Sequence, residues 1–285
     1  MPIPIPKSEP RSKTALQRHY EVEKALADRL RHASKTERQT LYSEVYDDLF
    51  RQITDLPKAV DNPNAQQHLV NLKTDALRPF LSCESEFLEV GAGDCALALN
   101  VAGIVKKVHA IEASVEALGA LETPDNFNLL ISDSIALPLD NATIDVAYSC
   151  HFIEHLHPAD ARDHAAEIYR VLRPGGIYQC ITPNRLWGPH DISRYFDDVP
   201  TGFHLREYTH SDLAGLLHEA GFRDSKVIRG IGQQSTQTSL WPYRFVEGLL
   251  DLLPVYLRRR VMDRFLRGMQ KPFRPMEQVM VVTRR

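Results

Sequence analysis

The stretch Phe87-Leu88-Glu89-Val90-Gly91-Ala92-Gly93-Asp94-Cys95 decides the fold of this chain. Its apolar run predicts a buried strand that ends at Val90, and a helix is expected to begin near Ala96. Gly91 and Gly93 lack a Cβ, so the backbone between the strand and the helix can turn sharply and approach a ligand. The first N–H groups of that helix would point at the ligand, as they do in nucleotide-binding folds.

The glycine turn alone leaves three interpretations open. Gly91, Gly93 and Ala96 match the G-x-G-x-x-A pattern of dinucleotide binding. S-adenosylmethionine is the other nucleotide-like cofactor that this geometry suits. A tight strand-to-helix turn that binds no ligand is the third interpretation.

From residue 86 onward, strands are expected to alternate with helices. The strands are predicted at 86–90, 107–112, 127–131, 144–149, 177–182, 225–231 and 278–283. The helices are predicted at about 96–103, from Ser114, at 159–172 and at 211–220. This alternation predicts an α/β fold with a doubly wound, mostly parallel, seven-stranded sheet. The ligand crevice is expected at the carboxyl ends of the strands.

The rest of the chain divides into a tail, a helical cap and an insertion. Residues 1–13 are rich in Pro, Lys and Ser, which is typical of a disordered tail. Residues 14–82 predict an N-terminal helical cap, in which Ser34 and Glu37 form a capping box. Residues 83–285 are expected to form the main domain, with a helical insertion at about 233–275. The cap could pack on the core, cover the substrate, or do both.

The composition is that of an ordinary globular protein, with 43% hydrophobic and 25% charged residues in 285. A net charge of −3 gives no electrostatic reason to expect a nucleic-acid partner. No apolar run is long enough for a transmembrane segment, and the N-terminal residues do not resemble a signal peptide. The four scattered cysteines favour reduced thiols. We therefore expect a cytoplasmic protein.

Two acidic residues follow predicted strands on the same side of the sheet. Glu112 lies about 20 residues beyond the glycine turn, where an acid binds ribose hydroxyls in nucleotide-binding folds. Asp133 comes directly after the next strand, where a carboxylate can accept a hydrogen bond from the exocyclic amine of an adenine. A solvent-exposed acid at a strand end is the structural alternative for each.

With Glu89-Val-Gly-Ala-Gly, Glu112, Asp133 before Leu137-Pro138, Asp145-Val146 and Leu172-Arg-Pro-Gly-Gly176, the chain resembles the class I S-adenosylmethionine-dependent methyltransferases. The resemblance is closest to small-molecule enzymes with Glu-His after strand four, and it implies a Rossmann-like fold. It implies that Glu89, Gly91 and Gly93 contact the methionine part of the cofactor, Glu112 the ribose and Asp133 the adenine. Ser134 and Ser149 are placed in the same cofactor site.

The segment His151-Phe152-Ile153-Glu154-His155 carries the predicted catalytic residues His151, Glu154 and His155. On one helical turn, His151 and His155 would share a face and could bind a divalent metal with Glu154. Methyltransferases that act on the terminal ribose of small RNAs resemble this arrangement. We expect no metal, however, and we expect His151 to act as a general base, because its unperturbed pKa suits proton transfer near neutral pH.

The loops after the fifth strand combine polar and aromatic residues, which suits a hydroxylated acceptor such as a sugar. The predicted substrate-binding residues are Asn184, Arg185, His190, Tyr195, His204 and Tyr208. Residues 249–269 combine apolar and arginine residues, which predicts a lid helix or, less favoured, a peripheral membrane contact.

The sequence thus predicts a methyltransferase that uses S-adenosylmethionine and acts on a small molecule, with O-methylation of a sugar or glycan as the finer expectation. The alternatives are a metal-dependent RNA 2′-O-methyltransferase and an NAD-dependent oxidoreductase. The oxidoreductase would share the glycine turn and Glu112, but it would leave Asp133 and Pro174-Gly175-Gly176 unexplained.

Overall fold

The computed structural model describes residues 2–7, 9–53, 63–113, 122–230, 232–267 and 278–285. The predicted helix from Ser114 and the end of the 249–269 segment lie outside these residues. The described helices are α1 (Lys13–His32), α2 (Lys35–Gln52), α3 (Pro63–Leu77), α4 (Ala96–Ala102), α5 (Pro158–Val171), α6 (His210–Glu219), α7 (Trp241–Asp251) and α8 (Val255–Arg267). The strands are β1 (Glu86–Val90), β2 (Lys107–Glu112), β3 (Phe127–Ile131), β4 (Ile144–Cys150), β5 (Leu172–Pro183), β6 (Lys226–Arg229), β7 (Thr236–Thr238) and β8 (Gln278–Arg284).

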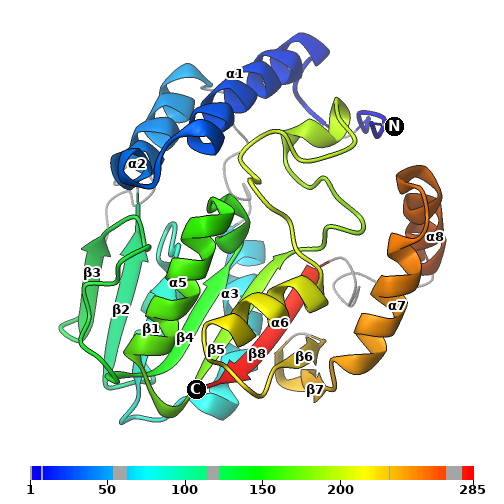
Figure 1. Ribbon diagram of the computed structural model, residues 1–285. Helices are drawn as coiled ribbons and strands as arrows, with labels where there is room; N and C mark the ends of the chain where they lie inside the picture. The colour runs from blue at the N-terminus through cyan, green and yellow to red at the C-terminus, as the bar shows by residue number, and fades with distance from the viewer. Residues whose placement is uncertain (1, 8, 54–62, 114–121, 231, 268–277) are drawn as a thin grey trace.

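One mixed sheet forms the centre of the molecule, with the strand order β3-β2-β1-β4-β5-β8-β6-β7 (Figure 1). The pairs from β3 to β5 are parallel, whereas β8 is antiparallel to both β5 and β6. The order reverses direction between β1 and β4, so their carboxyl ends form the switch point at which an open α/β sheet binds its ligand.

The prediction of an α/β, mostly parallel, Rossmann-like sheet is confirmed, but the predicted number of seven strands is wrong. The structure has an eighth strand, β7, which pairs with β6 at one edge of the sheet. Its residues Thr236–Thr238 lie inside the region expected to be a helical insertion. A three-residue strand is too short to give a recognisable alternation of apolar and polar residues.

Helices cover both faces of the sheet and bury separate apolar clusters against it. The larger cluster joins α1, α2, α5 and α6 to the sheet, through residues such as Leu30, Val45 and Ile168. The second cluster packs α4 and the end of α3 on the opposite face, through residues such as Val101 and Leu77. Burial of these side chains is the main stabilising contribution to the fold.

A buried ion pair fixes the N-terminal cap to the core. Arg38 of α2 donates from Nε and Nη2 to the Asp160 carboxylate of α5, at 2.6 and 2.8 Å. Tyr42 donates its hydroxyl to the same carboxylate at 2.8 Å. The capping box of Ser34 and Glu37 at the start of α2 is present as expected. In the N-terminal tail, the N–H of Ile3 donates to the Arg194 carbonyl.

Residues 249–267 belong to two helices, so the expected single amphipathic helix is wrong. α7 ends at Asp251, with Leu252 as its C-cap, and α8 begins at Val255. Pro254 lies between the two helices and explains the break, because proline cannot continue a helix. Both helices lie at one side of the sheet, beyond β6 and β7 (Figure 1). Several apolar side chains on them are exposed: Trp241, Phe245, Leu249, Leu252, Tyr256 and Val261.

No helix among the described residues has the length and apolar character needed to span a bilayer.

Candidate functional site

A cavity of about 250 Å³ lies at the carboxyl ends of β1, β2 and β4. It brings together Gly91, Gly93, Glu112 and Asp133, which the sequence assigned to the cofactor, and His151 and His155, which it assigned to catalysis. Residues from four separate stretches of sequence therefore meet at the switch point of the sheet.

The glycine turn has the conformation that its sequence requires. Gly91 and Gly93 have φ values of +67° and +55°, in the left-handed region that favours glycine. A Cβ at Gly91 would lie 2.8 Å from Cδ2 of Phe152, so a side chain at this position has no room. A Cβ at Gly93 would meet nothing within 4 Å, so open space lies beside that residue. The turn therefore leaves a backbone cradle beside the cavity, which fits a nucleotide-like cofactor.

Glu112 and Asp133 stand at the ends of neighbouring strands, β2 and β3, and both line the cavity. Oε2 of Glu112 accepts a hydrogen bond from the N–H of Gly93 at 2.8 Å, so the carboxylate is held against the glycine turn. Oδ1 of Asp133 accepts from the N–H of Ile135 at 3.0 Å and stabilises the turn after β3. Oε1 of Glu112 also accepts from the N–H of Ala113 at 2.9 Å, so backbone hydrogen bonds orient both acids.

Glu89 lies beneath the cavity rather than in its wall, since it is buried on β1 and does not line the space. Its Oε2 is buried and has no hydrogen-bond partner among the described residues. Burial raises the pKa of Glu89 to about 8, although the charge of Lys73 opposes that shift. A cationic group bound nearby would therefore be favoured by this carboxylate.

His151 reaches the cavity from a backbone position that is not helical. Its φ is +55°, and the short helix after β4 spans only Ile153–His155. The expectation that His151 and His155 share one helical face is therefore wrong. Nδ1 of His151 lies 3.3 Å from Oε1 of Glu154, and Nε2 lies 3.0 Å from the side-chain amide of Gln278. A carboxylate oxygen accepts the Nδ1 proton, which leaves Nε2 as the acceptor nitrogen.

Glu154 is fully buried and holds its neighbours in place. Oε2 accepts the hydroxyl hydrogen of Thr182 at 2.9 Å. Burial would raise the pKa of Glu154, but the hydrogen bond with His151 and the charges of His155, His151 and His204 lower it to about 2. An ionised Glu154 therefore orients the His151 ring and fixes its tautomer, so it is a positioning residue.

His155 and His204 form a T-shaped ring contact beside Glu154, with ring centroids 5.1 Å apart. Burial lowers the pKa of His155 to about 4, so this ring is neutral near pH 7. Burial also disfavours charge on His204, but the hydrogen bond with Glu207 and the charges of Glu154, Glu207 and Asp191 raise its pKa to about 9. His155 is therefore neutral near pH 7, whereas His204 is protonated and carries a positive charge near Glu154 and Glu207.

Glu154, His155 and His204 form the one group among the described residues whose ligand atoms could hold a metal ion, all within 4.8 Å of one another. The sequence pointed to His151 and His155 instead, because they are close in the chain. The geometry replaces His151 with His204, which is distant in sequence and offered no local spacing signal.

Helix α2 contributes the wall of the cavity that sequence reasoning missed. Tyr42, Tyr46 and Phe50 line it at intervals of four residues, so they share one face of the helix. The spacing was visible in the sequence, although an aromatic stripe is more often part of a core. Because Arg38 and Tyr42 bind Asp160, the cap is held in contact with the site as well as with the core.

The structure does not bring Ser134 or Ser149 to the cavity. Ser149 is fully buried, and its hydroxyl lies 2.6 Å from the hydroxyl of Tyr178 inside the core. Ser134 is also buried, and its carbonyl accepts from Nδ1 of His164 at 2.7 Å. Strand β4 is buried on both faces, so the alternation of its residues could not show which side Ser149 faces.

The predicted substrate-binding residues divide into four groups. His204 meets the cavity residue His155, and His190 lies near it, since its N–H donates to the Glu207 carboxylate that also holds His204. Asn184 and Tyr208 are buried and bridge the end of β5 to the start of α6. Tyr195 packs with the α1 residues Leu16 and Tyr20. Arg185 lines a second cavity, described below.

Part of the chain, including most of the residues around the cavity, is similar to known methyltransferases. Residues 88–180 match the family model described as a methyltransferase domain. A protein of Mycolicibacterium smegmatis named as a probable S-adenosylmethionine-dependent methyltransferase is 33% identical over 140 residues, which are 48% of this chain and 51% of that protein. An O-methyltransferase of Pyrenophora dematioidea is 36% identical over 160 residues, which are 52% of this chain and 57% of that protein. The chain thus spans about half the length of these relatives.

The fold agrees with this relationship. The crystal structure of an S-adenosylmethionine-dependent methyltransferase from Archaeoglobus fulgidus superposes with a TM-score of 0.52 at 16% identity, over 77% of this chain and 94% of that chain. The dinucleotide alternative loses its support, because the matched segment contains the glycine turn, Glu112 and Asp133 together. Residues 88–180 thus match a methyltransferase domain, and the chain has the fold of a solved S-adenosylmethionine-dependent methyltransferase.

Proposed function

We propose that this protein is a methyltransferase that transfers a methyl group from S-adenosylmethionine to a hydroxyl oxygen of a small molecule, with a sugar or glycan as the acceptor class. The observation that carries the proposal is the cavity that joins the glycine turn, Glu112 and Asp133 to His151 and to the aromatic face of α2. One side of it suits a nucleotide and the other suits a polar molecule with an apolar face.

The residues of the cavity would divide the work of binding. The N–H groups of the glycine turn and the carboxylates of Glu112 and Asp133 would hold the cofactor, which supplies an electrophilic methyl group when it is bound. Tyr46 and Phe50 would cover the acceptor and exclude water from the cavity. The protein contributes mainly proximity and orientation, which can lower the barrier of such a reaction by several kcal/mol.

His151 would take the proton of the acceptor hydroxyl. The new bond joins the acceptor oxygen to the methyl carbon, and the bond from that carbon to sulfur breaks. The proton passes to Nε2 of His151, which gives up the hydrogen bond that it accepts from the Gln278 amide. Glu154 keeps the proton of Nδ1 in place at 3.3 Å, so the acceptor nitrogen faces away from the carboxylate. His204 would act as a positioning residue, because its ring packs on His155 of the cavity wall.

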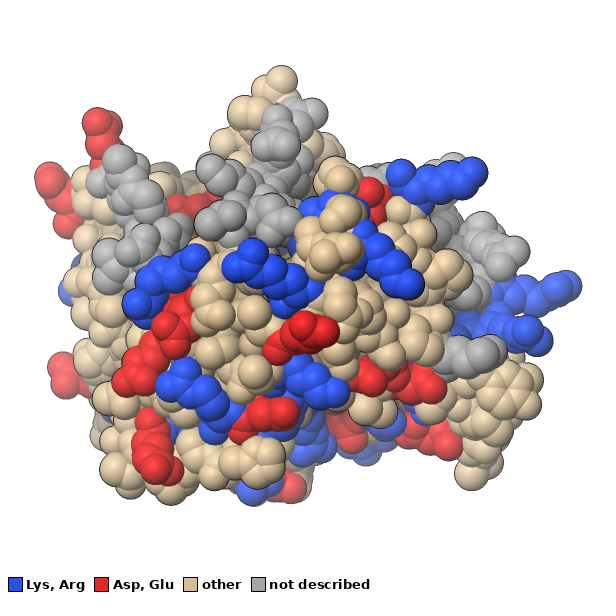
Figure 2. Space-filling view, turned by 90° about the horizontal axis from the view of Figure 1, so that it is seen from above, with Lys and Arg blue, Asp and Glu red and all other residues tan. Residues whose placement is uncertain are grey.

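The O-methyltransferase of Pyrenophora dematioidea supports oxygen as the methylated atom, although it matches only part of the chain. RNA is the less favoured acceptor. Figure 2 shows Lys and Arg side chains interspersed with Asp and Glu over one face of the molecule. Phosphate backbones are bound by continuous basic surfaces, so this mixed face favours an uncharged or small acceptor.

The test is methyl transfer from labelled S-adenosylmethionine to a panel of nucleotide sugars, glycans, polyols, phenols and short RNAs, with detection by mass spectrometry. We expect transfer to a hydroxylated small molecule, and we expect His151→Ala to reduce kcat about 100-fold or more with little change in cofactor binding. Robust transfer to a phenol or to RNA, with none to sugars or glycans, would refute the acceptor class.

The exposed apolar side chains of α7 and α8 bear on the peripheral membrane contact that the sequence left as the less favoured alternative. Trp241 and Phe245 are exposed, and arginines follow on α8. The lid interpretation is favoured by Arg259 of α8, which donates to the Gly188 carbonyl at 3.1 and 2.9 Å. Cosedimentation with vesicles of anionic lipid distinguishes a lid from a membrane contact. If α7 and α8 form a lid, Trp241→Ser should leave the fraction of protein bound to the vesicles unchanged; if they contact a membrane, it should lower that fraction.

A further inference from the structure

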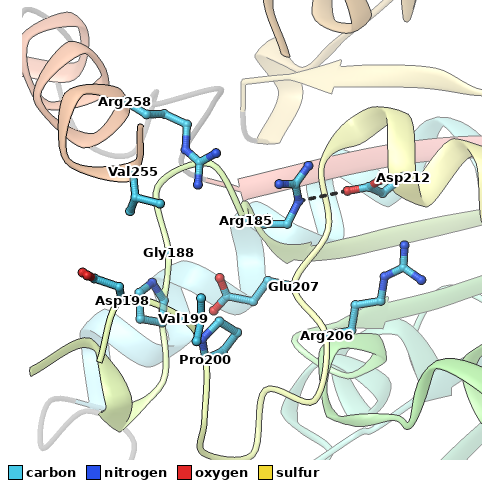
Figure 3. Close-up of a pocket in the computed structure, with 11 residues that line it drawn as sticks. Arg185, Gly188, Asp198, Val199, Pro200, Arg206, Glu207, Asp212, Val255 and Arg258 are labelled. Atoms are coloured by element: carbon cyan, nitrogen blue, oxygen red, sulfur yellow. Dashed lines mark hydrogen bonds and ion pairs between the residues drawn. The ribbon is translucent and has the colours of Figure 1, made fainter. Parts of the chain in front are cut away.

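A second cavity, of about 430 Å³, lies between helix α8 and the loops that follow β5. It shares no lining residue with the cofactor cavity. Figure 3 shows Arg258 entering from α8, Glu207 entering from the opposite loop, and Arg185 between them. Val199, Pro200 and Val255 add apolar surface to the wall. The cavity wall therefore combines apolar surface with arginine donors.

The three lining arginines keep donors that the protein does not use fully. Arg185 is paired with Asp212 at 3.3 Å and with Asp251 at 2.9 Å. Arg258 shares Asp251 at 3.1 Å, and its Nε is buried without a hydrogen-bond partner among the described residues. Arg206 packs over the Tyr208 ring at 5.1 Å, and no carboxylate in the described part of the chain is paired with it.

Two of the three carboxylates of the wall, those of Asp198 and Asp212, are already engaged. Asp212 accepts from the N–H of Thr209 as well as from Arg185, because it completes the capping box of α6. Asp198 is paired with Arg259 at 3.2 Å. Neither of these two acids is paired with Arg206 or Arg258 among the described contacts, and the wall as a whole carries three arginines and three acids.

The pKa of Arg258 reflects its burial and its two arginine neighbours, Arg185 and Arg259. Burial lowers it, Asp251 opposes that shift, and the charges of Arg185 and Arg259 add to it. A bound anion would offset the mutual repulsion of these guanidinium groups. Arginine is the residue best suited to phosphate, since its planar fork can donate two parallel hydrogen bonds.

Glu207 indicates a second property of the ligand, besides negative charge. Its Oε1 accepts from His190 N–H and from Nδ1 of His204, both at 2.7 Å. Its Oε2 is buried and has no donor among the described residues. A Cβ at Gly188 would overlap this carboxylate, so the chain has glycine where the carboxylate needs room. An unpaired carboxylate oxygen in the wall favours a ligand that carries a hydroxyl donor.

We propose that this second cavity binds a hydroxylated phosphate monoester, such as a sugar or polyol phosphate, through Arg185, Arg206 and Arg258 on the phosphate and Glu207 on a hydroxyl. This binding site is separate from the cofactor cavity and adds to the proposed methyl transfer. Glu207 links the two sites, because its other oxygen holds His204, which packs on His155.

The test is calorimetric titration of the full chain with inorganic phosphate, glycerol and glycerol 3-phosphate at low salt. We expect glycerol 3-phosphate to bind at least about fivefold more tightly than inorganic phosphate, glycerol not to bind, and added KCl to weaken both anions. Arg258→Gln and Arg206→Gln should each reduce the affinity for glycerol 3-phosphate about tenfold, the loss of one charge-assisted contact.

Arg264→Gln, an exposed arginine on the same helix, is the matched control and should bind like the native protein. Titration with S-adenosylhomocysteine, which should be unchanged in all three variants, reports that the domain is folded and tests the methyltransferase assignment separately. The proposal is overturned if neither anion binds, if both arginine variants keep native affinity, or if glycerol 3-phosphate binds no more tightly than inorganic phosphate.

Discussion

The Arg38 guanidinium donates two hydrogen bonds to the Asp160 carboxylate, at 2.6 and 2.8 Å, and both side chains are buried. Arg38→Met should therefore leave a buried carboxylate without its main partner and lower the free energy of unfolding by about 3 kcal/mol. Because Arg38 fixes α2, the acceptor KM should rise more than the affinity for the cofactor falls. Chemical denaturation and steady-state kinetics measure the two effects.

Lys35→Met is the control for this prediction. Lys35 of the same helix pairs with Asp163 of α5, but both side chains are exposed. Its loss should have little effect on stability, since surface ion pairs contribute little. Equal destabilisation by the two variants would mean that the buried pair does not anchor the cap.

The second prediction compares two glycine-to-alanine substitutions that should change protein stability in opposite directions. Gly91→Ala adds a Cβ at a φ of +67°, against Phe152, and should cost about 1–2 kcal/mol in left-handed strain, together with most of the cofactor affinity. Gly215→Ala lies in the middle of α6, where a Cβ meets nothing within 4 Å, and should stabilise the protein by about 0.5–1 kcal/mol. Thermal melts with and without S-adenosylhomocysteine test both, and a neutral Gly91→Ala would contradict the role of the turn.

The raised pKa of Glu89, about 8 against an ordinary value of 4.5, predicts a pH dependence of stability. Between these values the folded state holds a proton that the unfolded state has lost. This contribution is therefore fully present below pH 4.5 and is lost as the pH rises through 8. Glu89→Gln cannot ionise, so its loss of stability between pH 5 and pH 8 should be smaller than that of the native protein.

The exposed Glu84 provides the comparison for this effect, and Glu84→Gln should keep the native pH profile. Denaturation at a series of pH values gives the slopes. Parallel profiles for the native protein and Glu89→Gln would show that Glu89 is ionised in the folded state.

Removal of metal ions should leave the melting temperature unchanged, although Glu154, His155 and His204 could supply metal ligands. The pKa of His204 is raised to about 9, chiefly by Glu207 acting against burial, so its proton occupies this site near pH 7. We expect the same melting temperature in EDTA and in Mg²⁺, Mn²⁺ or Zn²⁺ at pH 7. A rise of several degrees with one cation, abolished by His204→Gln, would instead establish a metal site.

Local sequence signals predicted the parts of the fold that depend on neighbouring residues. The strand before Gly91 follows from its apolar run, and the start of α2 follows from the capping box of Ser34 and Glu37. The places of Glu112 and Asp133 follow from parallel strands that end at one edge of the sheet. Such signals act over a few residues and survive in any tertiary context.

Contacts between distant segments could not be predicted in the same way. His204 joins His155 and Glu154 only because the loop after β5 folds back over the end of β4, and no spacing in the sequence encodes this return. The left-handed backbone of His151 broke the expected helical pairing with His155. Ser149 faces the core because β4 is buried on both sides, where polar and apolar positions do not alternate.

Calorimetric titration with S-adenosylhomocysteine, and separately with NADH, tests the central claim most directly. The account predicts that S-adenosylhomocysteine binds and NADH does not. It predicts that Asp133→Ala, which removes a carboxylate from the cavity wall, weakens binding about tenfold, whereas Asp140→Ala at an exposed position does not. Binding of NADH alone, or S-adenosylhomocysteine affinity that Asp133→Ala leaves unchanged, would contradict the assignment of this cavity to the methyl donor.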